Sequence, residues 1–218
     1  ASDLAEFLIT YYTPENGIIL DQFSGRFTIG CAALHHGRRF VGYDLNPKNV
    51  ERAREVISKH ICTDKSRYEL HNSDGVYLKE FDGKTEYFDG IVCDPPYVLK
   101  AEKNSEDPRE IGNLSHEEYL KRIKLNLQRC YDLIKTSNFE DKTFYPVIFK
   151  TGTGRRGKMG IIDMDSIFQS LASEVGFTLW DKLTNELHTP FACVSWERNY
   201  INKYVQKNYE VSLVWVKF

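Results

Sequence analysis

Four aspartates follow short apolar runs that have the character of β-strands, and the last of them begins a rigid turn. They are Asp21, Asp44, Asp74 and Asp94. In Asp94-Pro95-Pro96-Tyr97 the prolines end the strand and fix the backbone, because proline lacks an N–H and has a restricted φ. The turn holds a carboxylate, a proline carbonyl and an aromatic ring close together, which suits the binding of a planar group with an NH2. A proline-rich turn with a capping aspartate is the alternative interpretation.

The elements that would position these aspartates alternate between strands and helices. The apolar patterns predict strands over residues 17–21, 39–44, 68–71, 87–93, 145–149, 177–183 and 210–217. Helices are predicted over residues 3–12, 28–36 and 47–61, from a cap at Ser115 to about Ile134, and over 163–175. This alternation indicates one α/β domain over residues 1–218, with a mostly parallel sheet wound with helices. Residues 99–113 and 184–209 are candidate lid or target-recognition loops.

Ligands bind at the carboxyl ends of the strands in such a sheet, which is where the aspartates are expected to gather. A glycine turn, Phe23-Ser24-Gly25, opens the helix after the first strand. Asp44 stands 19 residues after Gly25, a spacing at which a carboxylate accepts hydrogen bonds from ribose hydroxyls. Asp74 would accept a hydrogen bond from an adenine amine. Since there is no GxGxxG motif, a nucleoside without a pyrophosphate fits best, and S-adenosylmethionine is such a ligand, with its sulfonium facing Phe23 and Asp21.

The segments Asp21-Gln22-Phe23-Ser24-Gly25, Gly42-Tyr43-Asp44 and Asp94-Pro95-Pro96-Tyr97 resemble those of the DNA amino-methyltransferases. The resemblance implies a Rossmann-like class I methyltransferase fold, with a seven-stranded sheet, an antiparallel last strand and helices on both faces. It implies that Asp94, Pro95, Pro96 and Tyr97 are catalytic. The implied cofactor-binding residues are Tyr11, Thr13, Asp21, Phe23, Ser24, Gly25, Asp44, Leu45, Asp74, Gly75 and Asp94.

The resemblance also implies a reaction on DNA. Asp94 and the Pro95 carbonyl would accept hydrogen bonds from the amine of a flipped-out base, and Tyr97 would stack on that base. The Asp-Pro-Pro-Tyr form favours the N6 amine of adenine. An RNA or cytosine-N4 amino-methyltransferase is an alternative. A degenerate binding subunit is another, because the family has proline where Gln22 stands and glycine where Phe27 stands. The Phe27 side chain either rotates into the core or weakens cofactor binding.

The remaining features concern partners and setting. Arg155, Arg156 and Lys158 lie in a glycine-rich segment that is a candidate phosphate-binding loop, with a solvated loop as the alternative. A net charge of −2 provides no global basic field, so a homodimer or partner protein is expected to help hold DNA. Five scattered cysteines without a CxxC pair, and histidines without metal-ligand spacing, indicate reduced thiols and no metal. We expect a cytoplasmic bacterial, archaeal or phage protein with no membrane span, and Tyr43, Tyr87 and Trp180 in its core.

Overall fold

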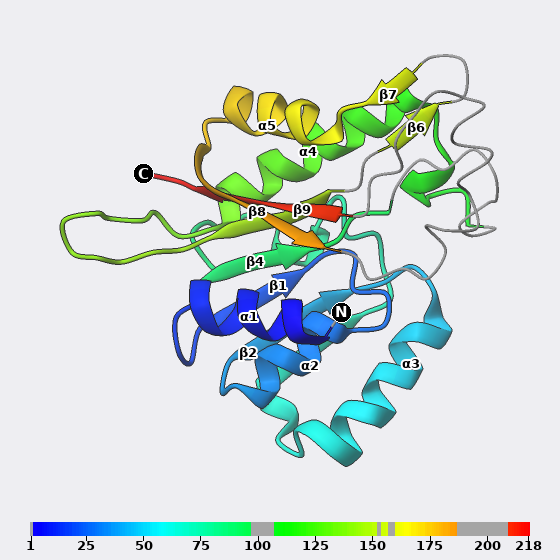
Figure 1. Cartoon of the computed structure of the whole chain (residues 1–218). Coiled ribbons are helices and arrows are strands. Elements are labelled where there is room, and N and C mark those ends of the chain that lie inside the picture. Colours follow the sequence, from blue (N-terminus) through cyan, green and yellow to red (C-terminus); the bar gives the residue numbers. More distant parts are fainter. Residues whose placement is uncertain (1, 97–106, 152–153, 157–159, 187–208) are drawn as a thin grey trace.

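A seven-stranded sheet crosses the centre of the protein in the order β3-β2-β1-β4-β5-β9-β8 (Figure 1). The computed structural model describes residues 2–96, 107–151, 154–156, 160–186 and 209–218. The strands of the sheet are β1 (Ile18–Asp21), β2 (Arg39–Tyr43), β3 (Tyr68–His71), β4 (Gly90–Cys93), β5 (Val147–Thr151), β8 (Thr178–Glu186) and β9 (Tyr209–Val216). Strands β1 to β5 pair in parallel, whereas β9 is antiparallel to both of its neighbours. The predicted mixed sheet with an antiparallel last strand is therefore confirmed.

Helices cover both faces of the sheet (Figure 1). One face carries α1 (Ser2–Tyr12), α2 (Thr28–His35) and α3 (Pro47–Val56), and α3 continues as a π-helical turn over Ile57–Ile61. The other face carries α4 (His116–Leu133) and α5 (Met164–Val175). Short 3-10 turns occupy Lys65–Arg67, Lys79–Phe81 and Ile111–Asn113. Side chains cap the first turns of two helices: Asn46 accepts a hydrogen bond from Lys48 N, and Ser115 accepts one from Glu118 N.

Alternate residues of the central strands supply two hydrophobic cores, one on each face. Val92 and Ile148 pack on the α1–α2 side, whereas Ile91, Val147 and Phe149 pack on the α4–α5 side. This two-residue period follows from the pleat of a strand, whose side chains point alternately to opposite faces. The sheet is thus buried on both faces and provides a rigid platform for the loops at its ends.

The strand order reverses between β1 and β4. From β1 the chain moves outward to β2 and β3, and it then returns to β4 on the other side of β1. The loops that follow β1 and β4 consequently leave in opposite directions and open a crevice at the carboxyl edge. The four predicted aspartates belong to this edge, because Asp21 ends β1, and Asp44, Asp74 and Asp94 follow β2, β3 and β4.

Several predicted boundaries differ from the structure. β4 begins at Gly90 rather than at residue 87, because the N–H groups of Tyr87 and Phe88 donate to Leu133 O instead of to a neighbouring strand. β5 covers residues 147–151 rather than 145–149. Part of the predicted glycine-rich loop forms a hairpin, in which β6 (Gly154–Arg156) pairs with β7 (Gly160–Ile162).

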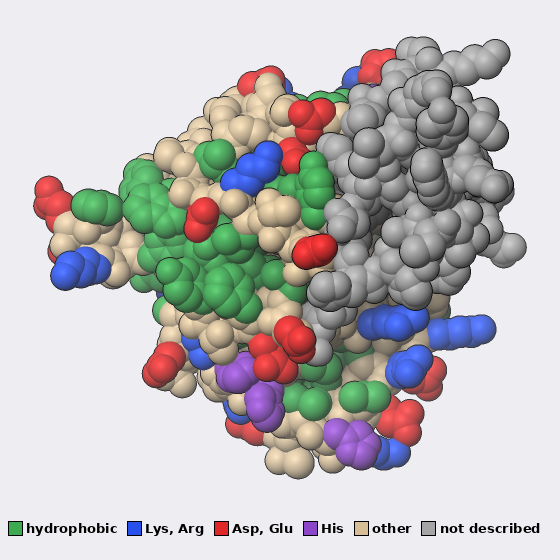
Figure 2. Space-filling model, in the orientation of Figure 1, with side chains coloured by type: hydrophobic (Ala, Val, Ile, Leu, Met, Phe, Trp, Pro, Cys, Tyr) green, Lys and Arg blue, Asp and Glu red, His purple; other side chains and the backbone are tan. Residues whose placement is uncertain are grey.

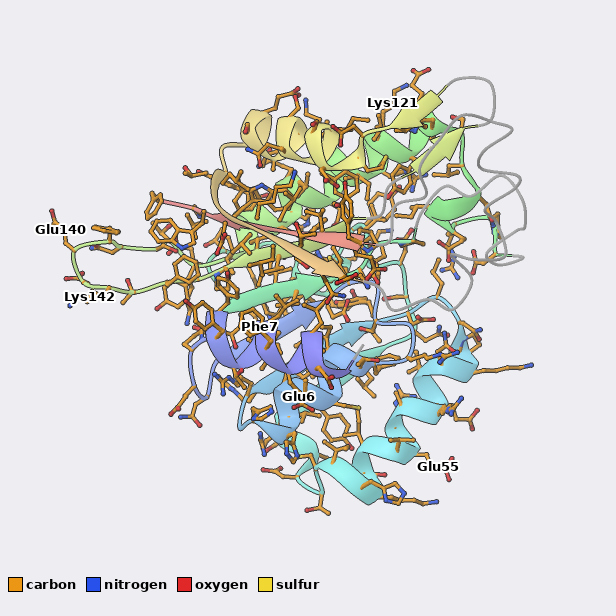
Figure 3. All side chains as sticks on the ribbon, viewed as in Figure 1. Glu6, Phe7, Glu55, Lys121, Glu140 and Lys142 are labelled. Atoms are coloured by element: carbon orange, nitrogen blue, oxygen red, sulfur yellow. The ribbon has the colours of Figure 1, made fainter. Side chains whose placement is uncertain are left out.

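Trp180 lies at the surface, and its predicted place in the core was wrong. β8 is the outermost strand of the sheet, so Trp180 is 45% exposed. Its ring contacts those of Phe139 and Phe218, at centroid distances of 6.2 and 6.1 Å. Figure 2 shows hydrophobic side chains gathered on this side of the molecule, and Figure 3 shows Phe7 on the nearby helix α1. Tyr43 is fully buried and Tyr87 is partly buried.

Across the described ranges, no helix combines the length and the apolar character that a bilayer crossing requires.

Candidate active site

The turn after β1 is held by hydrogen bonds to its own residues and to β2. Ser24 N donates to Tyr43 O at 2.8 Å, and Ser24 Oγ donates to Asp21 O at 2.8 Å. Phe23 N donates to Asp21 Oδ1 at 3.1 Å. Gly25 has φ +49°, a left-handed conformation that glycine adopts at little cost. Predicted residues Asp21 and Ser24 thus shape the turn, whereas Phe23 and Gly25 line the pocket above it.

Phe27 rotates into the core, one of the two outcomes expected from its sequence. The residue has φ +59° and precedes α2, so its backbone keeps the left-handed form usual for glycine. Its side chain is 1% exposed and packs edge-on against Phe40, with ring centroids 6.4 Å apart. Gly42 makes room for this ring, because a Cβ there would lie 2.9 Å from Phe27 Cε1. The bulky side chain therefore points away from the pocket.

Asp21 is a buried carboxyl surrounded by other acids. Its side chain is 3% exposed, and burial, reinforced by the charges of Asp94 and Asp44, raises its pKa to about 8. The hydrogen bond from Phe23 N opposes this rise only in part. Near neutral pH, Asp21 is thus largely protonated, and a cation bound nearby would favour its ionised form.

Asp44 and Asp74 face the same pocket from adjacent strand ends. Asp44 Oδ1 accepts from Asn46 N at 2.7 Å and from Asn49 Nδ2 at 3.1 Å. Partial burial raises the pKa of Asp44, and these hydrogen bonds oppose the rise. Asp74 Oδ1 accepts from Val76 N at 3.0 Å. Both carboxylates are therefore oriented by the backbone before any ligand binds.

The pocket at this edge has a volume of about 260 Å³. This volume is just below the range of roughly 300–1,000 Å³ typical of small-molecule sites. A second cavity of about 360 Å³ shares Ser73, Asp74 and Arg109 with it and extends the hollow. The first pocket is lined by Gln22, Phe23, Gly25, Asp44, Leu45, Ser73, Asp74, Gly75, Val76, Asp94, Pro96, Arg109, Glu110 and Ile111.

Part of the predicted 99–113 loop forms the outer wall of this pocket. Residues 99–106 lie outside the described residues, whereas Arg109, Glu110 and Ile111 line the cavity. Arg109 is held by Asp107, with Nη2 2.7 Å from Oδ2. Burial, with the charges of Asp44, Asp107 and Asp74, raises the pKa of Glu110. Of the other candidate loop, residues 184–186 belong to β8, residue 209 begins β9, and 187–208 lie outside the described residues.

Asn126 is a structural residue of the site that the sequence did not reveal. It is fully buried on α4, and its Nδ2 donates to Gly75 O at 3.0 Å and to Val76 O at 3.2 Å. Its Oδ1 accepts from Gln22 Nε2 at 3.2 Å. Asn126 thus ties the turn after β1 to the turn after β3. One feature of the sequence could have indicated this role: Asn126 follows Ile123 by three residues, which places a polar amide on the apolar stripe of the helix.

Asp94, Pro95 and Pro96 continue from β4 beside the pocket. Pro96 and Asp94 line it, Pro95 is buried, and the Asp94 side chain is 45% exposed. Lys150, near the end of β5, places its Nζ 2.7 Å from Asp94 Oδ2. Tyr97, the last residue of the predicted tetrapeptide, lies outside the described residues.

Two residues predicted to bind the cofactor, Tyr11 and Thr13, do not line this pocket. Thr13 O accepts from Arg38 Nη2, and Thr13 contacts Gly90, so it lies where β2 and β4 begin. Tyr11 is 70% exposed and stacks on Phe7 at 5.2 Å. The reason is that α1 ends just before β1 starts, which places its last turn at the amino edge of the sheet.

The predicted phosphate-binding residues are only partly described. Arg155 and Arg156 lie in β6, whereas Lys158 lies outside the described residues. Within the described part of the chain, no cluster of three or more histidine, cysteine, aspartate or glutamate side chains is arranged to hold a metal ion.

The sheet order, the glycine turn and the pocket at the switch point together define a class I methyltransferase fold. Solved structures share it. A TehB-like S-adenosylmethionine-dependent methyltransferase from Corynebacterium glutamicum matches with a TM-score of 0.57 and 19% identity, over 98% of this chain and 87% of that one. An S-adenosylmethionine-dependent methyltransferase from Methanosarcina mazei matches with a TM-score of 0.59 and 12% identity, over 97% of each chain.

The family resemblance is confirmed over the first quarter of the chain, where a family model described as DNA methylase matches residues 2–55. Two curated relatives carry the name "Ribosomal RNA large subunit methyltransferase F". The protein from Bacteroides thetaiotaomicron is 28% identical over 43% of this chain and 31% of its own length. The protein from Pectobacterium atrosepticum is 24% identical over 52% of this chain and 40% of its own length. The chain thus spans well under half of these relatives.

Proposed function

We propose that this protein transfers a methyl group from S-adenosylmethionine to the N6 amine of a flipped-out adenine in DNA. One observation carries the proposal: the pocket beside the glycine turn is lined by Asp44 and Asp74 as well as by Asp94 and Pro96. A nucleoside cofactor and a planar amine would therefore meet at the carboxyl edge of the sheet. The matching family model, described as DNA methylase, supports DNA as the substrate.

The residues that line the pocket fit this cofactor. Asp44 would accept hydrogen bonds from the ribose hydroxyls, and Asp74 from the adenine amine. Leu45, Val76 and Ile111 offer apolar contacts to the cofactor's adenine ring. When bound, S-adenosylmethionine supplies an electrophilic methyl group on a positively charged sulfur. Phe23 and the acids around Asp21 would provide favourable surroundings for that charge.

The protein's contribution to the reaction is positioning and electrostatics. Asp94 and the Pro95 carbonyl would accept hydrogen bonds from the two N–H groups of the target amine, which directs its nitrogen lone pair toward the cofactor. Tyr97 would stack on the flipped base. Arg155, Arg156 and Lys158 would contact phosphates, and a homodimer or partner protein would complete the grip on DNA.

RNA is the second candidate substrate, because both curated relatives carry the name of a ribosomal RNA methyltransferase. Tritiated S-adenosylmethionine, supplied in parallel with double-stranded DNA and with ribosomal RNA, separates the two. Incorporation into RNA alone would replace the DNA proposal. Nuclease digestion and chromatography of the product then show whether the methyl group is on adenine or cytosine.

Two measurements test the site itself. Calorimetric titration with S-adenosylmethionine is expected to show binding, and no detectable heat at millimolar ligand would favour the degenerate binding subunit. Asp94→Ala is expected to keep cofactor binding and to lose methyl transfer. Full turnover by the purified variant would refute the role of Asp94.

A further inference from the structure

Lys150 lies between two carboxylates from different strands, and one of them is the proposed amine acceptor. Its Nζ is 2.7 Å from Asp94 Oδ2 and 3.0 Å from Glu210 Oε2. The Lys150 side chain is only 21% exposed. Burial by itself would lower the pKa of Lys150, but the charges of Asp94 and Glu210 outweigh it, so the pKa lies above its usual value. The ammonium is therefore fixed in place and positively charged at neutral pH.

The surroundings explain why a cation is needed there. After burial, the negative charge of Asp94 is one of the causes that raise the pKa of Asp21. The pKa values of Cys93 and of the buried Tyr119 hydroxyl are raised mainly by burial, and the charge of Asp94 adds to the rise. Lys150 therefore places one positive charge between the carboxylates of Asp94 and Glu210.

We propose that Lys150 is a positioning residue for methyl transfer. By binding Oδ2 it fixes the rotation of the Asp94 carboxylate, and with it the direction of Oδ1 toward the target amine. Glu210 holds Lys150 from the opposite side, on the antiparallel strand β9. This inference rests on the proposed function, and nothing in the sequence pattern assigned a role to either residue.

The test compares Lys150→Met with the same substitution at Lys135, whose aspartate partner lies at the opposite end of β4 from Asp94. Lys135 pairs with Asp89, just before β4, at 2.6 Å. In single-turnover assays at saturating cofactor, Lys150→Met is expected to slow methyl transfer by about 10²-fold, as misplacement of a reacting group does. Its Kd for S-adenosylmethionine should change by less than about threefold, because Lys150 does not line the pocket. Lys135→Met should leave the transfer rate unchanged.

A purely structural role predicts a different pattern. In that case Lys150→Met and Lys135→Met would lower the melting temperature alike, and neither would change the transfer rate of the folded fraction. Lys150→Arg should recover most of the rate, since a guanidinium also pairs with carboxylates. Glu210→Gln, which keeps the contact between Lys150 and Asp94, should slow transfer less than Lys150→Met does.

A readout without turnover keeps the inference separate from the proposed function. In NMR spectra of protein labelled with ¹⁵N-lysine, the Lys150 ammonium signal should shift in Asp94→Asn and stay unchanged in Asp89→Asn. An unchanged Lys150 signal in Asp94→Asn would overturn the inference. So would a Lys150→Met variant that transfers the methyl group as fast as an active wild type does. A wild type that methylates neither DNA nor RNA would instead refute the proposed function, together with the role that rests on it.

Discussion

Replacing Asp21 by asparagine tests the electrostatics of the site through protein stability. In the unfolded chain an aspartate titrates near pH 4, whereas the folded environment raises the pKa of Asp21 to about 8. Between these values the folded protein binds one more proton than the unfolded chain at this residue. The contribution of Asp21 to the free energy of unfolding is therefore fully present below about pH 4, falls as the pH rises, and is lost above about pH 8.

The size of this effect follows from the pKa difference. A difference of about four units corresponds to on the order of 5 kcal/mol, at about 1.4 kcal/mol per unit. Asparagine keeps an oxygen that can accept from Phe23 N and cannot ionise. We expect Asp21→Asn to resemble the wild type in stability near pH 5, and to exceed it by several kcal/mol near pH 8.5.

Urea unfolding at a series of pH values measures this difference. The matched control is Asp89→Asn, because Asp89 is a buried aspartate at the amino edge that is paired with Lys135. Losing that ion pair should destabilise the control near pH 5 and near pH 8.5 alike. Parallel stability curves for wild type and Asp21→Asn between pH 5 and pH 8.5 would refute the inferred state of Asp21.

Cofactor binding offers a second view of the same carboxyl group. Under the proposed function, a positively charged sulfonium near Asp21 favours its ionised form, so binding releases a proton below about pH 8. The affinity of the wild type for S-adenosylmethionine should then rise with pH, by at most about tenfold per pH unit. S-adenosylhomocysteine lacks the charge and should show a flatter dependence. Asp21→Asn should remove the difference between the two ligands.

Three further substitutions test the packing around the pocket. Phe27→Gly should destabilise the protein by about 3 kcal/mol in urea unfolding. It deletes a buried ring, and the relief of backbone strain at the positive φ offsets only part of that loss; a large gain in cofactor affinity would contradict this account. Gly75→Ala places a Cβ 2.1 Å from Gln22 O, so it should weaken calorimetric binding of S-adenosylmethionine at least tenfold, and unchanged affinity would argue against a rigid turn. Asn126→Leu leaves two buried carbonyls unpaired and should cost about 3 kcal/mol of unfolding free energy, whereas Gln128→Leu on the exposed face of α4 should cost little.

The sequence by itself determined the main elements and the chemistry at their ends. Two-residue periodicity, helix caps and the turn residues are local properties, so the parallel strands and the helices between them were predicted closely. Asp44, Asp74 and Asp94 each follow a strand, and in a parallel sheet that position alone sends them to one edge. The prolines after Asp94 ended β4 where expected, because a missing N–H acts without tertiary context.

Only the tertiary structure decided which side chains meet across the sheet. Lys150 and Glu210 come from strands 60 residues apart along the chain, and their pairing depends on the antiparallel register of β5 and β9. Asn126 links the turns after β1 and β3 because α4 packs close to both of them. Trp180 is exposed because β8 became an edge strand. Such contacts depend on strand order and register, which local residue patterns do not encode.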